Sequence, residues 1–196
     1  MTLLEAAHEY IAEGLNPLPI NNKKEPVLPP GHPFLYHKID NIDDRFTRCN
    51  KIAIACGTVS EGFYAIDFDG HGGEDIEAIF VEYFDNPAVQ HLINQDLLSV
   101  YKTPSGGFHI YYKCKIEVGA KKVARWKNGT GMIETRGHGS YIITYPSPGY
   151  QYVAGNEIIK LDYLDEETHN WLMELAGSFD QLPEIPSKEL NSGSRK

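Results

Sequence analysis

Two aspartates at the end of an apolar run are the first residues in this chain that could do chemistry. Asp67 and Asp69 stand two positions apart in the segment A-I-D-F-D-G at residues 65–70. Side chains alternate along a strand, so both carboxylates would project from one face. Carboxylates this close repel each other unless a cation lies between them, and hard oxygen ligands select Mg²⁺ or Mn²⁺. The alternative is a strand end followed by a solvated turn.

A glycine turn that leads into a histidine is the second motif. In T-P-S-G-G-F-H, residues 103–109, the proline and the glycines predict a turn whose backbone N–H groups converge on an anion, and Ser105 adds a hydroxyl. Beyond the turn, His109 and Tyr111 would share one strand face, from which His109 could donate to a phosphate oxygen. No G-K-[ST] follows, so this is not a Walker P-loop. The alternative is a plain hairpin turn before a surface or core histidine.

An acidic residue inside a third apolar run completes the set. Glu134 lies in M-I-E-T-R-G, residues 132–137, and Arg136 follows on the same expected strand face. A Glu134–Arg136 surface ion pair is the alternative. Three acids, an anion-binding turn and a histidine on neighbouring strands would form a metal site beside a phosphate site. Such a site is suited to nucleotidyl transfer.

The charge of the chain is unevenly distributed. The 196 residues have a net charge of −9 at pH 7, which by itself argues against a nucleic-acid partner. Residues 102–136 carry eight Lys or Arg against two Glu, a net charge of +6, and contain two of the three motifs. Part of this stretch could contact phosphates and stack on a base, the alternative being a solvated loop with its tryptophan in the core. The candidate contacts are Lys121, Lys122, Arg125 and Trp126.

The apolar periodicity predicts the elements that position these motifs. Thr2 and Glu5 form a capping box for an N-terminal helix, which Gly14 ends. Further helices are expected over residues 72–84 and 166–175. We expect strands or extended segments over residues 15–20, 52–56, 63–68, 99–102, 108–113, 131–135, 141–144 and 150–153.

These elements mix without a strict β-α-β rhythm, which predicts an α+β fold. The length suits one domain, or two small lobes that share a cleft. No apolar run approaches the ~20 residues that span a bilayer, and the N-terminus lacks the basic flank of a signal peptide. We therefore expect a protein of the host cytoplasm with no membrane partner. The cysteines form no C-x-x-C pair and are expected to be free thiols: Cys49, Cys56 and Cys114.

Together and in this order, the motifs resemble the primase–polymerase (Prim-Pol) branch of the archaeo-eukaryotic primase superfamily, found in plasmids, phages and mobile elements. The resemblance covers roughly residues 3–155. A-A-H-E-Y-I-A-E-G-L-N-P-L-P-I with K-K-E-P is similar to the opening helix and strand of the family. I-A-I-A-C-G-T-V-S-E-G-F-Y-A-I-D-F-D, T-P-S-G-G-F-H-I-Y-Y and I-E-T-R-G-H-G-S-Y-I-I-T-Y-P-S are similar to its three catalytic motifs.

The resemblance implies a primase-like core of mixed and antiparallel sheets with an RRM-like part, flanked by helices, with the active site in the cleft between two α/β units. The implied activity is template-directed DNA primase/polymerase in phage or mobile-element replication, with possible primer synthesis de novo. The implied partners are a single-stranded DNA template, a primer and a dNTP or NTP. We expect the catalytic domain over residues 1–177 and a linker over 178–196 that leads toward a helical or helicase region of a longer protein.

Carried over by position, the catalytic residues of the family fall on the three motifs. Asp67, Asp69 and Glu134 would hold two divalent ions, Mg²⁺ or Mn²⁺. Two departures stand out, because Gly107 replaces a frequent serine of the second motif and the third acid is Glu where many members have Asp. The triphosphate of the incoming nucleotide would contact Ser105, Gly106, Gly107, His109 and, as a weaker candidate, Arg136.

Three other functions stay open at this point. A non-catalytic module that binds single-stranded nucleic acid would carry three acids that repel phosphate in the absence of metal. A relaxase-type initiator would need H-x-H, and Tyr111 stands where the second histidine should be. A metal-dependent nucleotide phosphohydrolase would need no template.

Overall fold

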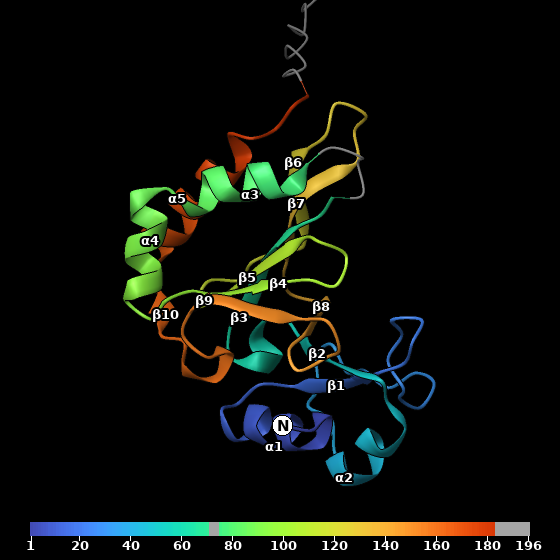
Figure 1. Cartoon of the computed structure of the whole chain (residues 1–196). Coiled ribbons are helices and arrows are strands. Elements are labelled where there is room, and N and C mark those ends of the chain that lie inside the picture. Colours follow the sequence, from blue (N-terminus) through green and yellow to red (C-terminus); the bar gives the residue numbers. More distant parts are fainter. Residues whose placement is uncertain (71–74, 183–196) are drawn as a thin grey trace, which may run out of the picture.

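Two largely antiparallel β-sheets form the centre of the molecule, and helices lie on their outer sides (Figure 1). The computed structural model describes residues 1–70 and 75–182. The helices are α1 (Leu3–Ala12), α2 (Ile42–Arg45), α3 (Ile76–Phe84), α4 (Pro87–Asn94) and α5 (Glu166–Gly177), with 3₁₀ turns at Phe46–Arg48, Thr58–Ser60 and Ile158–Lys160. The strands are β1 (Pro17–Ile20), β2 (Lys51–Ala55), β3 (Phe63–Phe68), β4 (Ser99–Lys102), β5 (Phe108–Cys114), β6 (Lys121–Arg125), β7 (Gly131–Arg136), β8 (Tyr141–Thr144), β9 (Gln151–Gly155) and β10 (Tyr163–Leu164).

The strand order separates two units. The small sheet has the order β1-β2-β8 and packs against α1. The large sheet has the order β6-β7-β3-β5-β4-β9, and β10 runs parallel to the end of β5. In the large sheet the chain passes from β3 through α3 and α4 to β4, so β5 comes to lie between β3 and β4. The α+β class, with antiparallel sheets flanked by helices, is confirmed.

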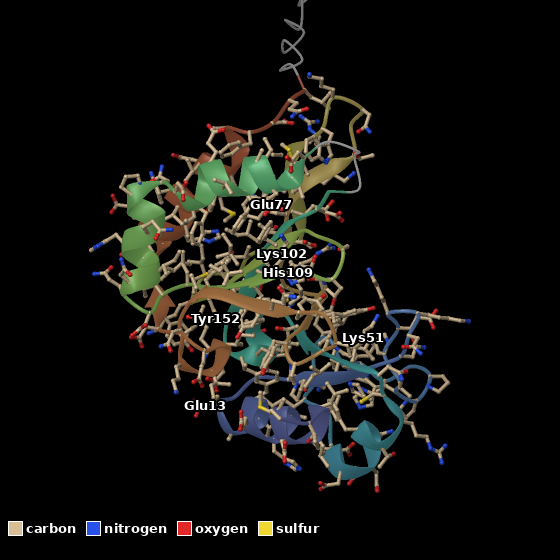
Figure 2. All side chains as sticks on the ribbon, viewed as in Figure 1. Glu13, Lys51, Glu77, Lys102, His109 and Tyr152 are labelled. Carbon is tan, nitrogen blue, oxygen red and sulfur yellow. The ribbon has the colours of Figure 1, made fainter. Side chains whose placement is uncertain are left out.

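Strand β3 lies at the centre of the large sheet, and all six of its residues are buried. One of its faces is covered by helices, where Phe68 meets the ring of Phe80 in α3 and Phe108 stacks on the same ring at 3.7 Å. Lys102 of β4 also pairs with Glu77 of α3 on this side, at 3.1 Å (Figure 2). The opposite face turns toward the small sheet and carries the polar motif residues.

Side-chain caps set the helix starts. The predicted capping box of Thr2 and Glu5 is confirmed. Helix α3 begins at Ile76, where the Asp75 carboxylate accepts from two backbone N–H groups. The expected start of this helix at residues 72–73 lies outside the described residues, as does most of the predicted linker, residues 183–196. The described residues 178–182 still contact β6, since the Gln181 backbone N–H donates to Arg125.

Strand β6 was expected to be a loop, and this expectation is wrong. Its sequence K-K-V-A-R does not alternate between polar and apolar residues as a half-buried strand does. In the structure, Lys121 and Lys122 are both exposed. Pairing with β7 at the edge of the sheet makes it a strand nonetheless, with two register shifts. All three cysteines are free thiols. In the described part of the chain, no helix has both the length and the apolar character needed to cross a membrane.

Candidate active site

Residues from the three motifs form one row across the central strands. The register places Asp67 of β3 opposite His109 of β5 on one side and opposite Glu134 of β7 on the other. Residues directly opposite each other project from the same face of a sheet. The expectation that the three motifs occupy neighbouring strands is therefore confirmed.

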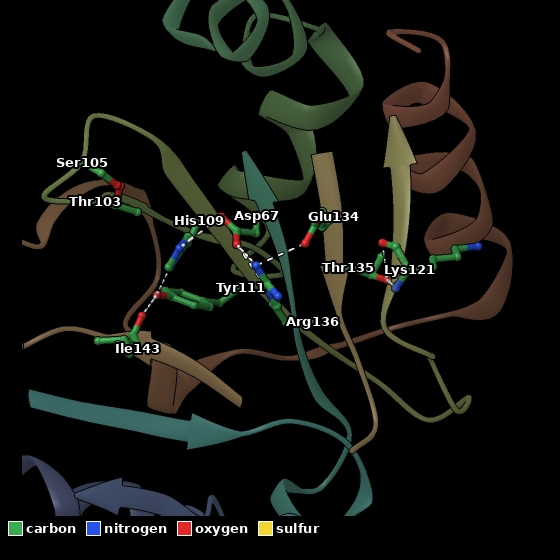
Figure 3. A network of polar contacts seen from close by, with 10 residues as sticks. All are labelled: Asp67, Thr103, Ser105, His109, Tyr111, Lys121, Glu134, Thr135, Arg136 and Ile143. Carbon is green, nitrogen blue, oxygen red and sulfur yellow. Dashed lines mark hydrogen bonds and ion pairs between the residues drawn. The ribbon is translucent and has the colours of Figure 1, made fainter. Parts of the chain in front are cut away.

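Asp67 has two hydrogen-bond donors as partners, His109 and Arg136, although it is only 8% exposed. Its Oδ1 lies 3.3 Å from Nε2 of His109, and its Oδ2 lies 2.8 Å from Nη2 and 3.1 Å from Nε of Arg136 (Figure 3). Burial alone would raise the pKa of Asp67, but the neighbouring His109 and Arg136 outweigh it and bring the pKa down to about 2. The carboxylate is therefore ionised at neutral pH.

The Arg136 guanidinium lies between two carboxylates. Its Nη2 is 2.8 Å from Oδ2 of Asp67 and 3.2 Å from Oε2 of Glu134 (Figure 3). Burial acts to lower the pKa of Arg136, and the two acids outweigh it and raise the pKa. A permanent cation thus bridges the two acids that the sequence analysis assigned to metal ions.

The imidazole of His109 is held from both ends. Its Nδ1 lies 2.8 Å from the hydroxyl of Tyr111, which is also 3.4 Å from the backbone oxygen of Ile143 in β8. Tyr111 is fully buried, which raises its pKa well above the usual value, so the hydroxyl keeps its proton. A neutral His109 that donates from Nε2 to Asp67 must accept at Nδ1, and Tyr111 can donate there.

A cavity of about 460 Å³ opens beside this row. The large sheet contributes Asp67, His109 and Arg136 to its wall, and the small sheet contributes part of β8. The site therefore lies between the two sheets, where the family resemblance implied a cleft. The remaining lining residues are Lys24, Leu35, Gly139, Ser140, Tyr141, Ile142, Ile143 and Tyr150.

A larger cavity of about 590 Å³ lies elsewhere on the molecule and does not contain the motif residues. Tyrosines dominate its lining, and its charged side chains are the two acids Glu9 and Glu157. Phosphate groups are not attracted to such a surface, so the smaller cavity is the better candidate for a nucleotide. The tyrosines are Tyr10, Tyr101, Tyr145 and Tyr152.

The glycine turn of the second motif does not line the 460 Å³ cavity. Its backbone closes on itself, since Gly106 donates to Thr103 at 3.0 Å and Thr103 donates to Gly107 at 2.8 Å. The Ser105 hydroxyl pairs with that of Thr103 at 3.1 Å. A Cβ at Gly107 would lie 2.3 Å from the backbone oxygen of Phe68, which explains why no serine stands there. Nucleotide contacts from this turn stay a prediction.

The predicted nucleic-acid contacts at residues 121–126 do not all lie on the surface. Trp126 is 1% exposed, and its indole N–H donates to the Asp69 backbone oxygen at 3.3 Å, so the ring lies in the core as in the alternative above. Arg125 is paired with Asp180 at 2.6 Å. Lys121 and Lys122 are exposed, and Lys122 lies opposite Glu134. Lys122 therefore shares the face of Glu134, whereas Lys121 lies opposite Thr135 on the side that helix α5 covers. Both lysines stay predicted nucleic-acid contacts.

The donor chemistry fits a divalent cation, although the geometry in this structure does not yet form a closed site. Among the described residues, no three His, Cys, Asp or Glu side chains are grouped closely enough to hold a metal ion. Arg136 lies between Asp67 and Glu134, with its Nη2 at 2.8 Å and 3.2 Å from their carboxylate oxygens. Asp69 follows at the end of β3, where its backbone N–H donates to Met132.

Sequence reasoning missed the contribution of the small sheet. Lys24 and Leu35 line the cavity from the connection between β1 and β2, and Tyr141 lines it from β8. The motif K-K-E-P, which precedes the first catalytic motif, was the one sequence signal that pointed to this connection.

The comparison with protein families adds an independent finding. The family model described as "Bifunctional DNA primase/polymerase, N-terminal" matches residues 7–175, a span that contains the whole row and the cavity. No curated protein matches the chain.

Proposed function

The chain belongs to the Prim-Pol family of bifunctional DNA primase/polymerases, and we propose that it adds nucleotides to a 3′-hydroxyl under the direction of a DNA template. The observation that carries this proposal is the pair of acids, Asp67 and Glu134, with the guanidinium of Arg136 between them beside a cavity. Two carboxylates that bind one cation between them are suited to bind another in the same place. The family generally uses divalent metals.

In the proposed reaction, Asp67, Asp69 and Glu134 hold two divalent ions, Mg²⁺ or Mn²⁺. Such ions would lower the pKa of the attacking hydroxyl and stabilise charge on the phosphates. Asp67 is suited to this role because it stays ionised although it is buried. It also fixes His109, since their side chains lie 3.3 Å apart.

His109 and Arg136 would bind the nucleotide. Both line the cavity, and Tyr111 holds the imidazole of His109 in a fixed orientation. Hydrogen bonds from charged donors to phosphate are strong, and they neutralise charge that develops on the leaving pyrophosphate. Arg136 would make such contacts after it leaves the two acids. It keeps its charge in either position.

The position of Tyr111 weighs against the relaxase alternative. It occupies the place of the second histidine, is fully buried and is hydrogen-bonded to His109. It therefore cannot supply the second imidazole of the H-x-H metal site that a relaxase needs.

The test of the proposal is template dependence. A labelled primer on a template with a defined overhang is incubated with Mg²⁺ or Mn²⁺ and one dNTP at a time. The proposal predicts that only the complementary dNTP extends the primer, and a bare single strand then tests primer synthesis. Hydrolysis of dNTPs without extension would instead support a phosphohydrolase. Binding without either reaction would support a non-catalytic module.

A further inference from the structure

The turn between β1 and β2 places a lysine on the wall of the active-site cavity. Lys24 lines this cavity together with Asp67, His109 and Arg136. It comes from the small sheet, whereas the other three come from the large sheet. The neighbouring Lys23 belongs to the same turn but is not part of the cavity wall.

Hydrogen bonds fix the backbone of Lys24. The Oδ1 of Asn21 accepts from the backbone N–H of Lys23 at 2.8 Å and from that of Glu25 at 3.0 Å, and Lys24 donates to the Asn21 backbone oxygen at 3.1 Å. The hydroxyl of Tyr141 in β8 donates to the Lys24 oxygen at 2.9 Å, which ties the turn to another part of the cavity wall. The turn therefore holds the lysine at a defined place.

The backbone of Lys24 is also in an unusual conformation. Its φ of +67° lies in the left-handed region, which a residue with a Cβ seldom adopts. Such conformations persist where the surrounding structure imposes them, and they are enriched at functional sites.

The charge of Lys24 is available for a ligand. The side chain is exposed, and within the described residues its ammonium group has no hydrogen bond or ion pair. The cavity thus gathers Lys24, His109 and Arg136 around the single carboxylate Asp67, which already has His109 and Arg136 as partners. This excess of donors suits a small ligand with several negative charges.

We propose that Lys24 binds the polyphosphate of the nucleotide substrate from the side opposite the catalytic row. This inference rests on the proposed function, since it names a further residue of that site. A polyphosphate concentrates its charges within one pocket, where these donors are also gathered, whereas the phosphates of a DNA strand are spread along its length. The turn therefore makes the small sheet part of nucleotide binding.

Equilibrium binding of inorganic tripolyphosphate in the presence of Mg²⁺ tests this directly, because it needs no polymerase activity. The variant is Lys24→Asn, which removes the charge. Asparagine is chosen because it tolerates the positive φ of this position better than most other uncharged residues with a side chain. Lys23→Asn is the matched control, with the same chemical change one residue away. We expect Lys24→Asn to weaken binding about tenfold or more, as for the loss of a charge-assisted hydrogen bond. Lys24→Arg should keep most of the affinity.

A specific loss in Lys24→Asn supports the inference even if the parent protein extends no primer, in which case only the proposed function fails. Equal binding by parent and Lys24→Asn, an equal loss in the Lys23 control, or no binding by the parent would overturn the inference. The inference would also be overturned if Lys24→Asn weakened the binding of single-stranded DNA alone, because Lys24 would then contact the DNA and not the nucleotide. Melting curves of all variants confirm that each one is folded.

Discussion

At the residue scale, the charge balance around Asp67 decides what the site can do. A carboxylate that is 8% exposed is stable only with compensating partners, and here His109 and Arg136 supply them. Arg136 also reaches Glu134, so one guanidinium separates two acids that would otherwise repel each other. The row is therefore organised before any substrate arrives.

Replacement of this cation should destabilise the protein and free the acids for metal. We expect Arg136→Met to lower the free energy of unfolding by roughly 1–3 kcal/mol, toward the lower end because the arginine side chain is 35% exposed. Added Mn²⁺ should raise the melting temperature of this variant more than that of the parent. Thermal melts with and without Mn²⁺ measure both effects.

Arg125→Met is the control for this prediction, because Arg125 also pairs with an aspartate, at 2.6 Å, but lies away from the cavity. Mn²⁺ should change the melting temperature of Arg125→Met by the same amount as that of the parent. A smaller Mn²⁺ shift in Arg136→Met than in the parent would show that the guanidinium does not occupy the place of the metal.

At the element scale, the strands that carry the motifs were predictable because their signals are local. Residues 63–68, 99–102 and 141–144 were predicted with the bounds that the structure has. Alternation within the strand at 108–113 also predicted that His109 and Tyr111 share a face, and their side chains lie 2.8 Å apart. Strand β6 was missed because its first two residues, Lys121 and Lys122, are exposed at an edge, and only its partner β7 makes it a strand.

Helix α5 introduces a dependence of stability on pH. Its His169 is buried against the ring of Tyr112, and Nδ1 has no hydrogen-bond partner among the described residues. Burial, and then the charge of Lys121, lower the pKa of His169, with Glu166 acting in the opposite direction. The unfolded chain therefore takes up this proton first as the pH falls, and the folded state loses stability below about pH 6.5.

Replacement of His169 should remove this contribution. We expect His169→Gln to show a smaller loss of stability between about pH 7 and pH 5 than the parent, measured by denaturant unfolding at each pH. His91→Gln, an exposed histidine on α4, is the control and should follow the parent. Identical pH profiles for the parent and His169→Gln would contradict the assignment.

At the scale of the whole molecule, the site belongs to both sheets. Alternation within the motifs predicted which side chains share a face, whereas the place of Leu35 in the cavity wall could not be predicted, because no local pattern tells which loop closes over a strand. The same holds for Trp126, whose side chain looked suited to stack on a base but lies in the core. For Lys24, only the resemblance of K-K-E-P to the opening segment of the family pointed to its loop. Long-range packing decides such placements.

Asn16 holds the loop from the small sheet against the cavity. It is 1% exposed, and its side chain donates to the backbone oxygens of Phe34 and His37 and accepts from the N–H of Ile39. The segment that it fixes carries Leu35, which lines the cavity. The position of Leu35 therefore depends on this buried amide.

Loss of the Asn16 amide should affect both stability and nucleotide binding. We expect Asn16→Ala to lower the free energy of unfolding by about 1–3 kcal/mol, because it leaves the buried N–H of Ile39 and two part-buried backbone oxygens without this partner. The KM for dNTP in primer extension should rise, with a smaller effect on kcat. Asn50→Ala, at an exposed position, should change neither quantity. An unchanged KM in a destabilised Asn16→Ala would limit the role of Asn16 to folding.

The central claim is that the carboxylates of the row catalyse template-directed nucleotidyl transfer. The most direct test is extension of a labelled primer on a template with dNTPs and Mg²⁺ or Mn²⁺, for the parent beside Asp67→Asn and Glu134→Gln. Glu77→Gln, on the helix-covered side of the sheet, is the matched control. We predict template-directed products from the parent and Glu77→Gln, and almost none from folded Asp67→Asn and Glu134→Gln. Comparable rates for the parent and Asp67→Asn would contradict the account.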